Sequence, residues 1–314
     1  MIGFLNALPG AAAQGLIWGV MAIGIYITYK ILDIADLTVD GSFGTGGAVF
    51  VISMISGRGI MLSMVLAFLA GCLAGLATGI LHTLFGIPAI LAGILSQLGL
   101  YSVNLAILGG ANMPISDRKY PLLVNLKNIY PSLLIAVAFV VVIITLLYWF
   151  FGTELGHSLR ATGCNQAMAR ANGINTNMNK IIAIVLSNGL VALSGSLLSQ
   201  WQGFADVNMG RGAIVIGLAA VIIGEVLFGK IFKNFALRLA GVACGGIVYF
   251  IVYTFVLRLG LKADWMKLLS ALVVAFFLAV PYWKKNWMEN HGQKNCRADT
   301  AEAPLKEEKK NVGN

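Results

Sequence analysis

The sequence predicts an all-α, polytopic membrane protein, a transmembrane helical bundle of about eight to ten spans. Of its 314 residues, 58% are hydrophobic and only 11% are charged, and the mean hydropathy is +0.84. One soluble core under a polar surface does not have this composition. The apolar residues are also grouped in runs that approach the length of about 20 residues needed to cross a bilayer.

Nine runs along the chain are interpreted as spans. They cover residues 12–31, 41–55, 60–84, 87–108, 131–151, 181–201, 213–228, 235–256 and 266–283. The first is too long for the core of a signal peptide, and no Lys or Arg precedes it, so we expect it to be retained as a helix. The second and seventh are short and interrupted by glycine, which is typical of discontinuous or re-entrant segments that line a transport path.

We expect two regions in the chain. Residues 1–283 form a transmembrane permease domain, and residues 284–314 form a charged tail with no apolar run, which we expect to be disordered. The basic residues of the tail place it on the cytoplasmic side by the positive-inside rule, and nine spans then place the N-terminus outside.

Composition and motifs argue against other classes. The net charge of +9 is distributed between the apolar runs and in the tail, as expected for contact with lipid and not with nucleic acid. Residues 224–231, GEVLFGKI, match a phosphate-binding loop except at the last position, where Ile231 cannot supply the hydroxyl that binds magnesium. No catalytic or metal site and no bound cofactor is predicted, so any ATP and magnesium would bind a separate polypeptide.

Small residues recur four apart in three of the runs, as Gly15 and Gly19, as Gly71, Gly75 and Gly79, and as Gly241 and Gly245. This spacing places glycines on one face of a helix and lets two backbones approach closely. We expect close helix packing at these positions.

Two carboxylates at the ends of spans have alternative interpretations. Asp40 could cap the N-terminus of the second span or line a path. Glu225 could pair with Lys230 or Lys233, or take part in proton coupling.

In the sixth span and just beyond it, polar side chains could form a hydrated wall or bond to their own helix. These are Asn188, Ser194, Ser196, Ser199, Gln200 and Gln202.

A polar segment, residues 156–180, interrupts the apolar pattern after the fifth run. Within it, Asn165 is a predicted N-cap and Asn172-Gly173 a predicted left-handed stop, which frame a short helix over residues 166–171 with Arg170 near its negative end. The segment is either a docking element for another protein or an ordinary solvated loop.

At these residues the chain resembles the permease subunits of bacterial ABC importers of the branched-chain amino acid type. The resemblance rests on Gly156-His-Ser-Leu-Arg-Ala-Thr-Gly163 and on Ala169-Arg-Ala-Asn-Gly-Ile-Asn175. Two further stretches, Leu37-Thr-Val-Asp-Gly-Ser-Phe-Gly44 and Ala205-Asp-Val-Asn-Met-Gly-Arg-Gly212, are similar to the tryptophan/tyrosine importer subgroup. The similarity extends from residue 15 to about residue 283.

The resemblance implies a multi-pass protein of the bacterial cytoplasmic membrane that works with a cytosolic ABC ATPase, an extracytoplasmic solute-binding protein and a second permease copy, most simply as a homodimer. It implies import of a small solute such as an aromatic or branched-chain amino acid. It also implies that the polar segment couples to the ATPase through six residues, Leu159, Arg160, Ala161, Thr162, Asn172 and Gly173.

Candidate path residues are those that are polar or aromatic within otherwise apolar spans, namely Asp40, Ser42, Phe43, Gln97 and Asn104. The alternative function is a stand-alone secondary transporter coupled to an ion through Asp40 or Glu225. A membrane-embedded enzyme would need a reactive cluster, and the sequence contains none that we identify.

Overall fold

The computed structural model describes residues 7–229, 231–232 and 234–258, together with six single positions between 268 and 279. The predicted tail, residues 284–314, and most of the predicted ninth span therefore lie outside the described residues. The described part is helical almost throughout, as predicted. Six helices, counting α2 with η1, are long and apolar enough to cross a membrane, and α3 and α10 are shorter apolar helices.

The helices coincide with the first eight predicted spans to within a few residues. The elements in chain order are α2 (Leu8–Tyr26), η1 (Ile27–Ile31), α3 (Val39–Ile55), α4 (Ile60–Thr83), α5 (Ala89–Leu108), β1 (Asn112–Pro114), α6 (Ile129–Phe151), α7 (Glu154–Cys164), α8 (Gln166–Ala171), α9 (Thr176–Gln202), β2 (Phe204–Asp206), α10 (Ala213–Phe228) and α11 (Phe235–Arg258).

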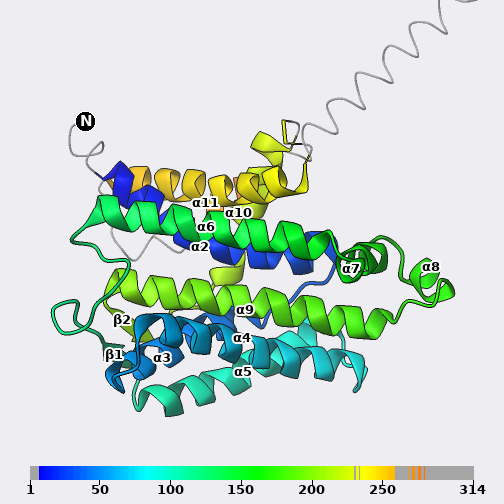
Figure 1. Cartoon of the computed structure of the whole chain (residues 1–314), viewed down its shortest axis with the longest axis horizontal. Coiled ribbons are helices and arrows are strands. Elements are labelled where there is room, and N and C mark those ends of the chain that lie inside the picture. The colour runs from blue at the N-terminus through cyan, green and yellow to red at the C-terminus, as the bar shows by residue number, and fades with distance from the viewer. Residues whose placement is uncertain are drawn as a thin grey trace, which may run out of the picture.

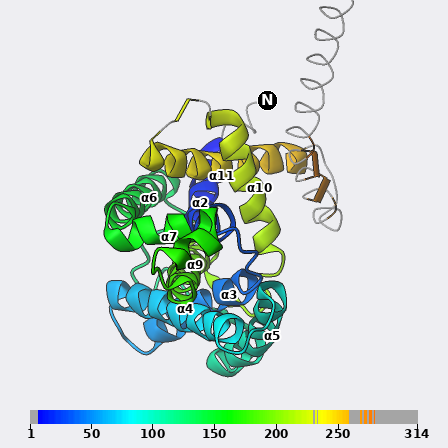
Figure 2. The ribbon, with the colours of Figure 1, turned by 90° about the vertical axis from the view of Figure 1, so that its right-hand side faces the viewer.

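Helix α9 lies in the middle of the bundle and packs against α2, α3 and α4 (Figures 1 and 2). Helices α2, α6, α10 and α11 lie on one side of it, and α3, α4 and α5 lie on the other (Figure 1). Asn175 caps the start of α9 by accepting from the backbone N–H of Met178, and Gly203 ends the helix in the left-handed conformation at φ 78°.

The bundle has two distinct ends. At the α7 end, α8 projects beyond the other helices (Figure 1). At the opposite end, β1 and β2 pair antiparallel, with Met113 opposite Ala205. Lys30 and Arg160 lie at the α7 end, while Arg118 and Lys127 lie in the segment that follows β1.

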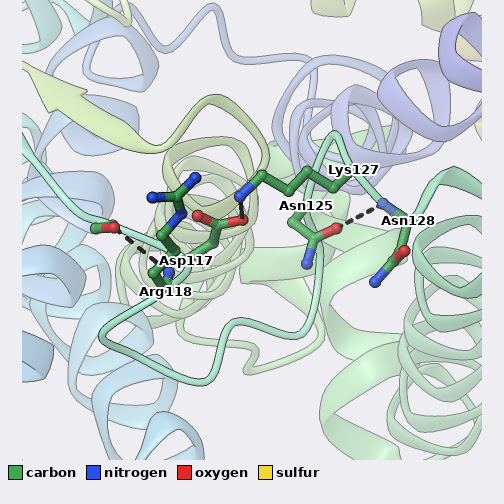
Figure 3. A network of polar contacts seen from close by, with 6 residues as sticks. Asp117, Arg118, Asn125, Lys127 and Asn128 are labelled. Carbon is green, nitrogen blue, oxygen red and sulfur yellow. Dashed lines mark hydrogen bonds and ion pairs between the residues drawn. The ribbon is translucent and has the colours of Figure 1, made fainter.

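The segment between β1 and α6 is held by its own polar contacts (Figure 3). Lys127 forms an ion pair with Asp117 at 2.6 Å, and the backbone N–H of Asn128 donates to Oδ1 of Asn125 at 2.9 Å. The hydrogen bond from Lys127 lowers the pKa of the partly exposed Asp117 carboxyl. At neutral pH this segment therefore keeps its charged pair.

Helices α3 and α10 are short because each begins inside the bundle. After η1 the chain turns at Asp33, with φ 56°, and runs without helix to residue 38. Helix α3 then starts beside the middle of α9, where Ser42 contacts Asn188, and continues toward the end of α9 near Ser199. The predicted discontinuous character of the second and seventh spans is therefore confirmed in this geometry.

The predicted close packing at the spaced glycines is confirmed. A Cβ added at Gly75 in α4 would lie 2.6 Å from the backbone oxygen of Ile184 in α9, and one at Gly15 in α2 would lie 2.6 Å from the Cα of Ile247 in α11. Such approaches favour helix association in a bilayer, where apolar burial between helices contributes little.

Substitution of Gly75 by valine is expected to lower stability by about 1 to 3 kcal/mol, because the branched side chain forces α4 away from the backbone of α9. The measurement is the thermal unfolding midpoint of the purified chain in detergent. The matched control is Gly99→Val in α5, because a Cβ at Gly99 meets nothing within 4 Å. Equal midpoints for both variants would contradict the packing argument.

Candidate functional site

Asp40 lies where the two short helices meet. Its carboxylate accepts from the backbone N–H of Gly212 and from that of Ile214, both at 2.9 Å, and these residues flank the first residue of α10. The prediction that Asp40 caps its own helix is wrong, since α3 has no side-chain cap. Asp40 lies in the first turn of α3, but its carboxylate accepts from free N–H groups at the start of α10. Without this carboxylate, those N–H groups would have no partner within a helix.

A second buried carboxylate, Asp36, lies near this junction. Its Oδ1 accepts from the backbone N–H of Thr38 at 2.9 Å, and its Oδ2 accepts from Nδ2 of Asn188 at 2.6 Å. Oδ1 of Asn188 in turn accepts from the hydroxyl of Ser42 at 2.6 Å. Asp36 is 4% exposed, and Asn188 and Ser42 are fully buried. An ionisable group in this position is unusual in a membrane bundle and points to a functional region.

The other predicted path residues gather around the same junction. Phe43 is buried and packs on Trp18, with ring centroids 5.1 Å apart. Asn104 donates to the backbone oxygen of Gly41 at 3.3 Å, and its own Oδ1 has no hydrogen-bond partner within the described part of the chain. Gln97 is half-buried and lies beside Gly41. The fold brings all five residues together, although their role in a path remains a prediction.

Within the described part of the chain, Glu225 pairs with a cation on another helical element. Its carboxylate forms an ion pair with Lys30 at 3.0 Å, at the end of α2. Lys230 and Lys233 lie outside the described residues. The pairing of Glu225 with either of them stays a prediction, and the ion pair with Lys30 joins α10 to η1.

The polar residues of α9 divide between the two predicted uses. Ser196 and Ser199 donate back to the carbonyl oxygens of their own helix, as expected for part of the set. Ser194 instead donates to the backbone oxygen of Ile17 in α2, and Gln200 accepts from the backbone N–H of Leu123. Together with Asn188, these side chains hold neighbouring segments against α9.

The short helix predicted in the polar segment is confirmed as α8. The side chain of Asn165 accepts from the backbone N–H of Met168 at 3.0 Å, and Gly173 adopts φ 78° just after the helix ends. The exposed residues here include Asn172, Gly173 and Met168, whose side chain is 65% exposed. Helix α8 therefore presents an apolar side chain and polar groups at the tip of the molecule (Figure 1).

Helix α7, in contrast, packs against the bundle. Of the predicted coupling residues, Leu159 and Thr162 are buried, Arg160 is half-buried and Ala161 is exposed. The guanidinium of Arg160 lies over the ring of Phe235 in α11 at 4.3 Å and over that of Phe151 in α6 at 5.4 Å. Arg160 thus joins α7 to the ends of two long helices through cation–π contacts.

Helix α7 also packs on the segment that leads to the junction. A Cβ added at Gly163 would overlap the backbone oxygen of Ile31 at the end of η1. From Ile31 the chain runs directly to Asp36 and then to Asp40. A continuous set of contacts therefore connects the projecting segment with the polar groups inside the bundle.

Sequence reasoning missed two members of this site. Trp18 reads as an ordinary apolar residue of the first span, and Asp36 as a residue of a loop between spans. Asp36 is one of three acids that flank the second span, but its bond to Asn188 joins residues far apart in the chain, as do the contacts of Trp18 with Phe43 and Phe250.

The described residues form a multi-pass helical bundle in which two short helices meet and α8 projects from one end, an arrangement consistent with a membrane transport protein. The sequence matches the family described as branched-chain amino acid transport system / permease component over residues 8–278. The chain belongs to this family of ABC transport permeases, and it is a multi-pass protein of the cytoplasmic membrane.

Curated relatives agree with the family. The chain is 42% identical to a tyrosine transport system permease protein of Clostridioides difficile, over 88% of this chain and 91% of that protein. It is 34% identical to the protein RP368 of Rickettsia prowazekii, over 88% of this chain and 98% of that protein. An autoinducer 2 import system permease protein, LsrC of Yersinia pseudotuberculosis, is 29% identical over 69% of this chain and 60% of that protein.

Proposed function

We propose that this chain is the transmembrane subunit of an ATP-driven importer for an amino acid, and that α8 docks onto a separate ATPase that binds ATP and magnesium. The observation that carries the proposal is the projection of α8 from one end of the bundle, capped at both ends and with Met168 exposed. A partner that fits such a tip has an apolar recess with a polar rim. This end then faces the cytoplasm, in agreement with the predicted topology.

Tyrosine or a related aromatic amino acid is the solute that the relatives favour, because the tyrosine transport permease covers nearly the whole chain. A solute-binding protein on the opposite side and a second copy of the permease complete the proposed assembly, as in other transport systems of this family. In this scheme, closure of the ATPase subunits displaces α8 and α7, and the contacts of α7 with η1 carry the displacement toward Asp40.

The alternative, a secondary transporter coupled to an ion through Asp40 or Glu225, receives less support from the geometry. Glu225 is held in an ion pair, and Asp40 is held by two backbone N–H groups. Uptake that collapses with the ion gradient and persists without any ATPase would favour this alternative.

Replacement of Met168 by glutamate is expected to abolish co-purification of the chain with its ATPase, because it places a charge in the apolar centre of the docking surface. The measurement is the recovery of ATPase subunits from the same organism on the tagged permease. The matched control is Leu126→Glu, an equally exposed apolar residue of the segment after β1, which is 56% exposed. Loss of the complex in both variants, or in neither, would contradict docking through α8.

Two further variants separate docking from transmission in the same assay. Replacing Asn172-Gly173 by Ala-Ala strains the left-handed turn after α8 and is expected to weaken the complex. Arg160→Gln removes the contacts with Phe151 and Phe235 and is expected to keep the complex but to reduce solute-stimulated ATP hydrolysis.

A further inference from the structure

A cavity of ≈ 540 Å³ lies between α2, α11 and the start of α10, away from the α7 end. This volume lies within the usual range of about 300 to 1,000 Å³ for pockets that bind small molecules. Three aromatic residues, Trp18, Phe250 and Tyr253, form part of its wall. Gln14, Gln202 and Arg211 supply polar groups to the same cavity.

The aromatic residues form a packed array. The ring centroids of Trp18 and Phe250 are 5.6 Å apart, and those of Phe250 and Tyr253 are 5.7 Å apart. On its other side Trp18 packs against Phe43, which lies one turn of α3 beyond Asp40. The wall of the cavity therefore continues to the junction of the two short helices.

Two polar side chains at the cavity, those of Trp18 and Arg211, have no hydrogen-bond or ion-pair partner among the described residues. Trp18 is 7% exposed, and its Nε1 has no hydrogen-bond partner among the residues that the structure describes. Buried indole N–H groups normally have a partner. Arg211 lies over the ring of Tyr101 at 5.6 Å, and no described carboxylate forms an ion pair with it.

We propose that this cavity binds a zwitterionic amino acid with an aromatic side chain. The ring packs against Trp18, Phe250 and Tyr253, where offset or edge contacts between rings are favourable. The guanidinium of Arg211 binds the carboxylate, since charge-assisted hydrogen bonds of this kind are strong and specific. The indole N–H of Trp18 donates to an oxygen of the solute, and the amide oxygens of Gln14 and Gln202 accept from the ammonium group.

This inference rests on the proposed function and extends it by placing a solute site within one permease chain. The solute site and the importer function can be tested separately, because the cavity and the docking helix α8 lie at opposite ends of the bundle. A failure of one leaves the other measurable.

The test is saturation-transfer NMR with L-tyrosine, tyramine and L-leucine on the full chain in detergent. This method detects weak binding without partner proteins. We expect saturation chiefly on the ring protons of tyrosine. Tyramine lacks the carboxylate and leucine lacks the ring, so each is expected to bind at least about tenfold more weakly.

Two variants locate the site. Trp18→Phe keeps the ring but removes the N–H, and it is expected to weaken tyrosine binding about tenfold. Arg211→Gln is expected to weaken it by more than tenfold and to reduce the preference for tyrosine over tyramine. The controls are Trp149→Phe, whose side chain is 72% exposed on α6, and Arg118→Gln, which is exposed in the segment after β1.

Arg211 is exposed, so its substitution tests the site even where Trp18→Phe proves unstable. Tyrosine binding that survives Arg211→Gln unchanged would overturn the proposal, as would equal binding of leucine and tyrosine. Absence of tyrosine binding at millimolar concentration, in a chain that still recovers its ATPase, would overturn the site while leaving the importer function intact.

Discussion

Substitution of Asn188 by leucine is expected to destabilise the chain by about 1.5 to 3 kcal/mol, because it removes a hydrogen-bond partner from a buried carboxyl group. Asn188 donates to Asp36 at 2.6 Å and accepts from Ser42 at 2.6 Å. Leucine makes neither bond, so among these contacts the carboxyl group of Asp36 keeps only those with Thr38. The thermal unfolding midpoint in detergent measures the loss.

A double substitution tests whether the loss comes from the unpaired carboxylate. When both partners of a buried hydrogen bond become apolar, the change can be nearly neutral. We therefore expect the double variant Asp36→Leu/Asn188→Leu to be more stable than Asn188→Leu alone, which a double-mutant cycle quantifies. The control is Asn177→Leu, an exposed residue in the first turn of α9. A double variant less stable than both single variants would contradict this explanation.

Substitution of Asp40 by leucine is expected to detach the start of α10 from α3. The carboxylate accepts from two backbone N–H groups of the α10 terminus at 2.9 Å each, and leucine accepts from neither. The N–H of Ile214 is half-buried, so the loss of its acceptor costs about 1 to 3 kcal/mol, whereas the exposed N–H of Gly212 can bond to water. If the junction moves during transport, solute uptake by the assembled importer falls at least about 100-fold, the factor that corresponds to about 3 kcal/mol.

Hydrogen–deuterium exchange of peptides covering residues 211–218 measures the local change directly. Exchange there is expected to be faster in Asp40→Leu than in the wild type, with Asp40→Asn intermediate because it keeps one acceptor oxygen. Asp206→Asn serves as the control, since Asp206 also accepts from a backbone N–H, that of Asn208 at 2.6 Å, but in an exposed turn. Unchanged exchange at residues 211–218 in Asp40→Leu would show that Asp40 does not hold α10.

These two positions illustrate different degrees of predictability. Asp40 was recognisable as a candidate because a carboxylate beside an apolar run is rare. Its role as a cap was also recognisable, but the helix it caps was not, because residue 40 and residue 212 become neighbours only in the fold. Asn188 was one of several polar residues in its span, and no sequence property separated it from Ser196, which bonds to its own helix.

The sequence by itself determined the class of protein, the eight apolar helices that match the predicted spans, and α8. These depend on hydropathy and on caps such as Asn165 and Gly173, whose physics is local and extends over only a few residues. The tertiary structure alone decided that α3 and α10 meet at Asp40, that Lys30 pairs with Glu225, and that Trp18 lines a cavity. Each of these contacts joins segments far apart in the chain, and their geometry follows from how closely the glycine-bearing helix faces pack.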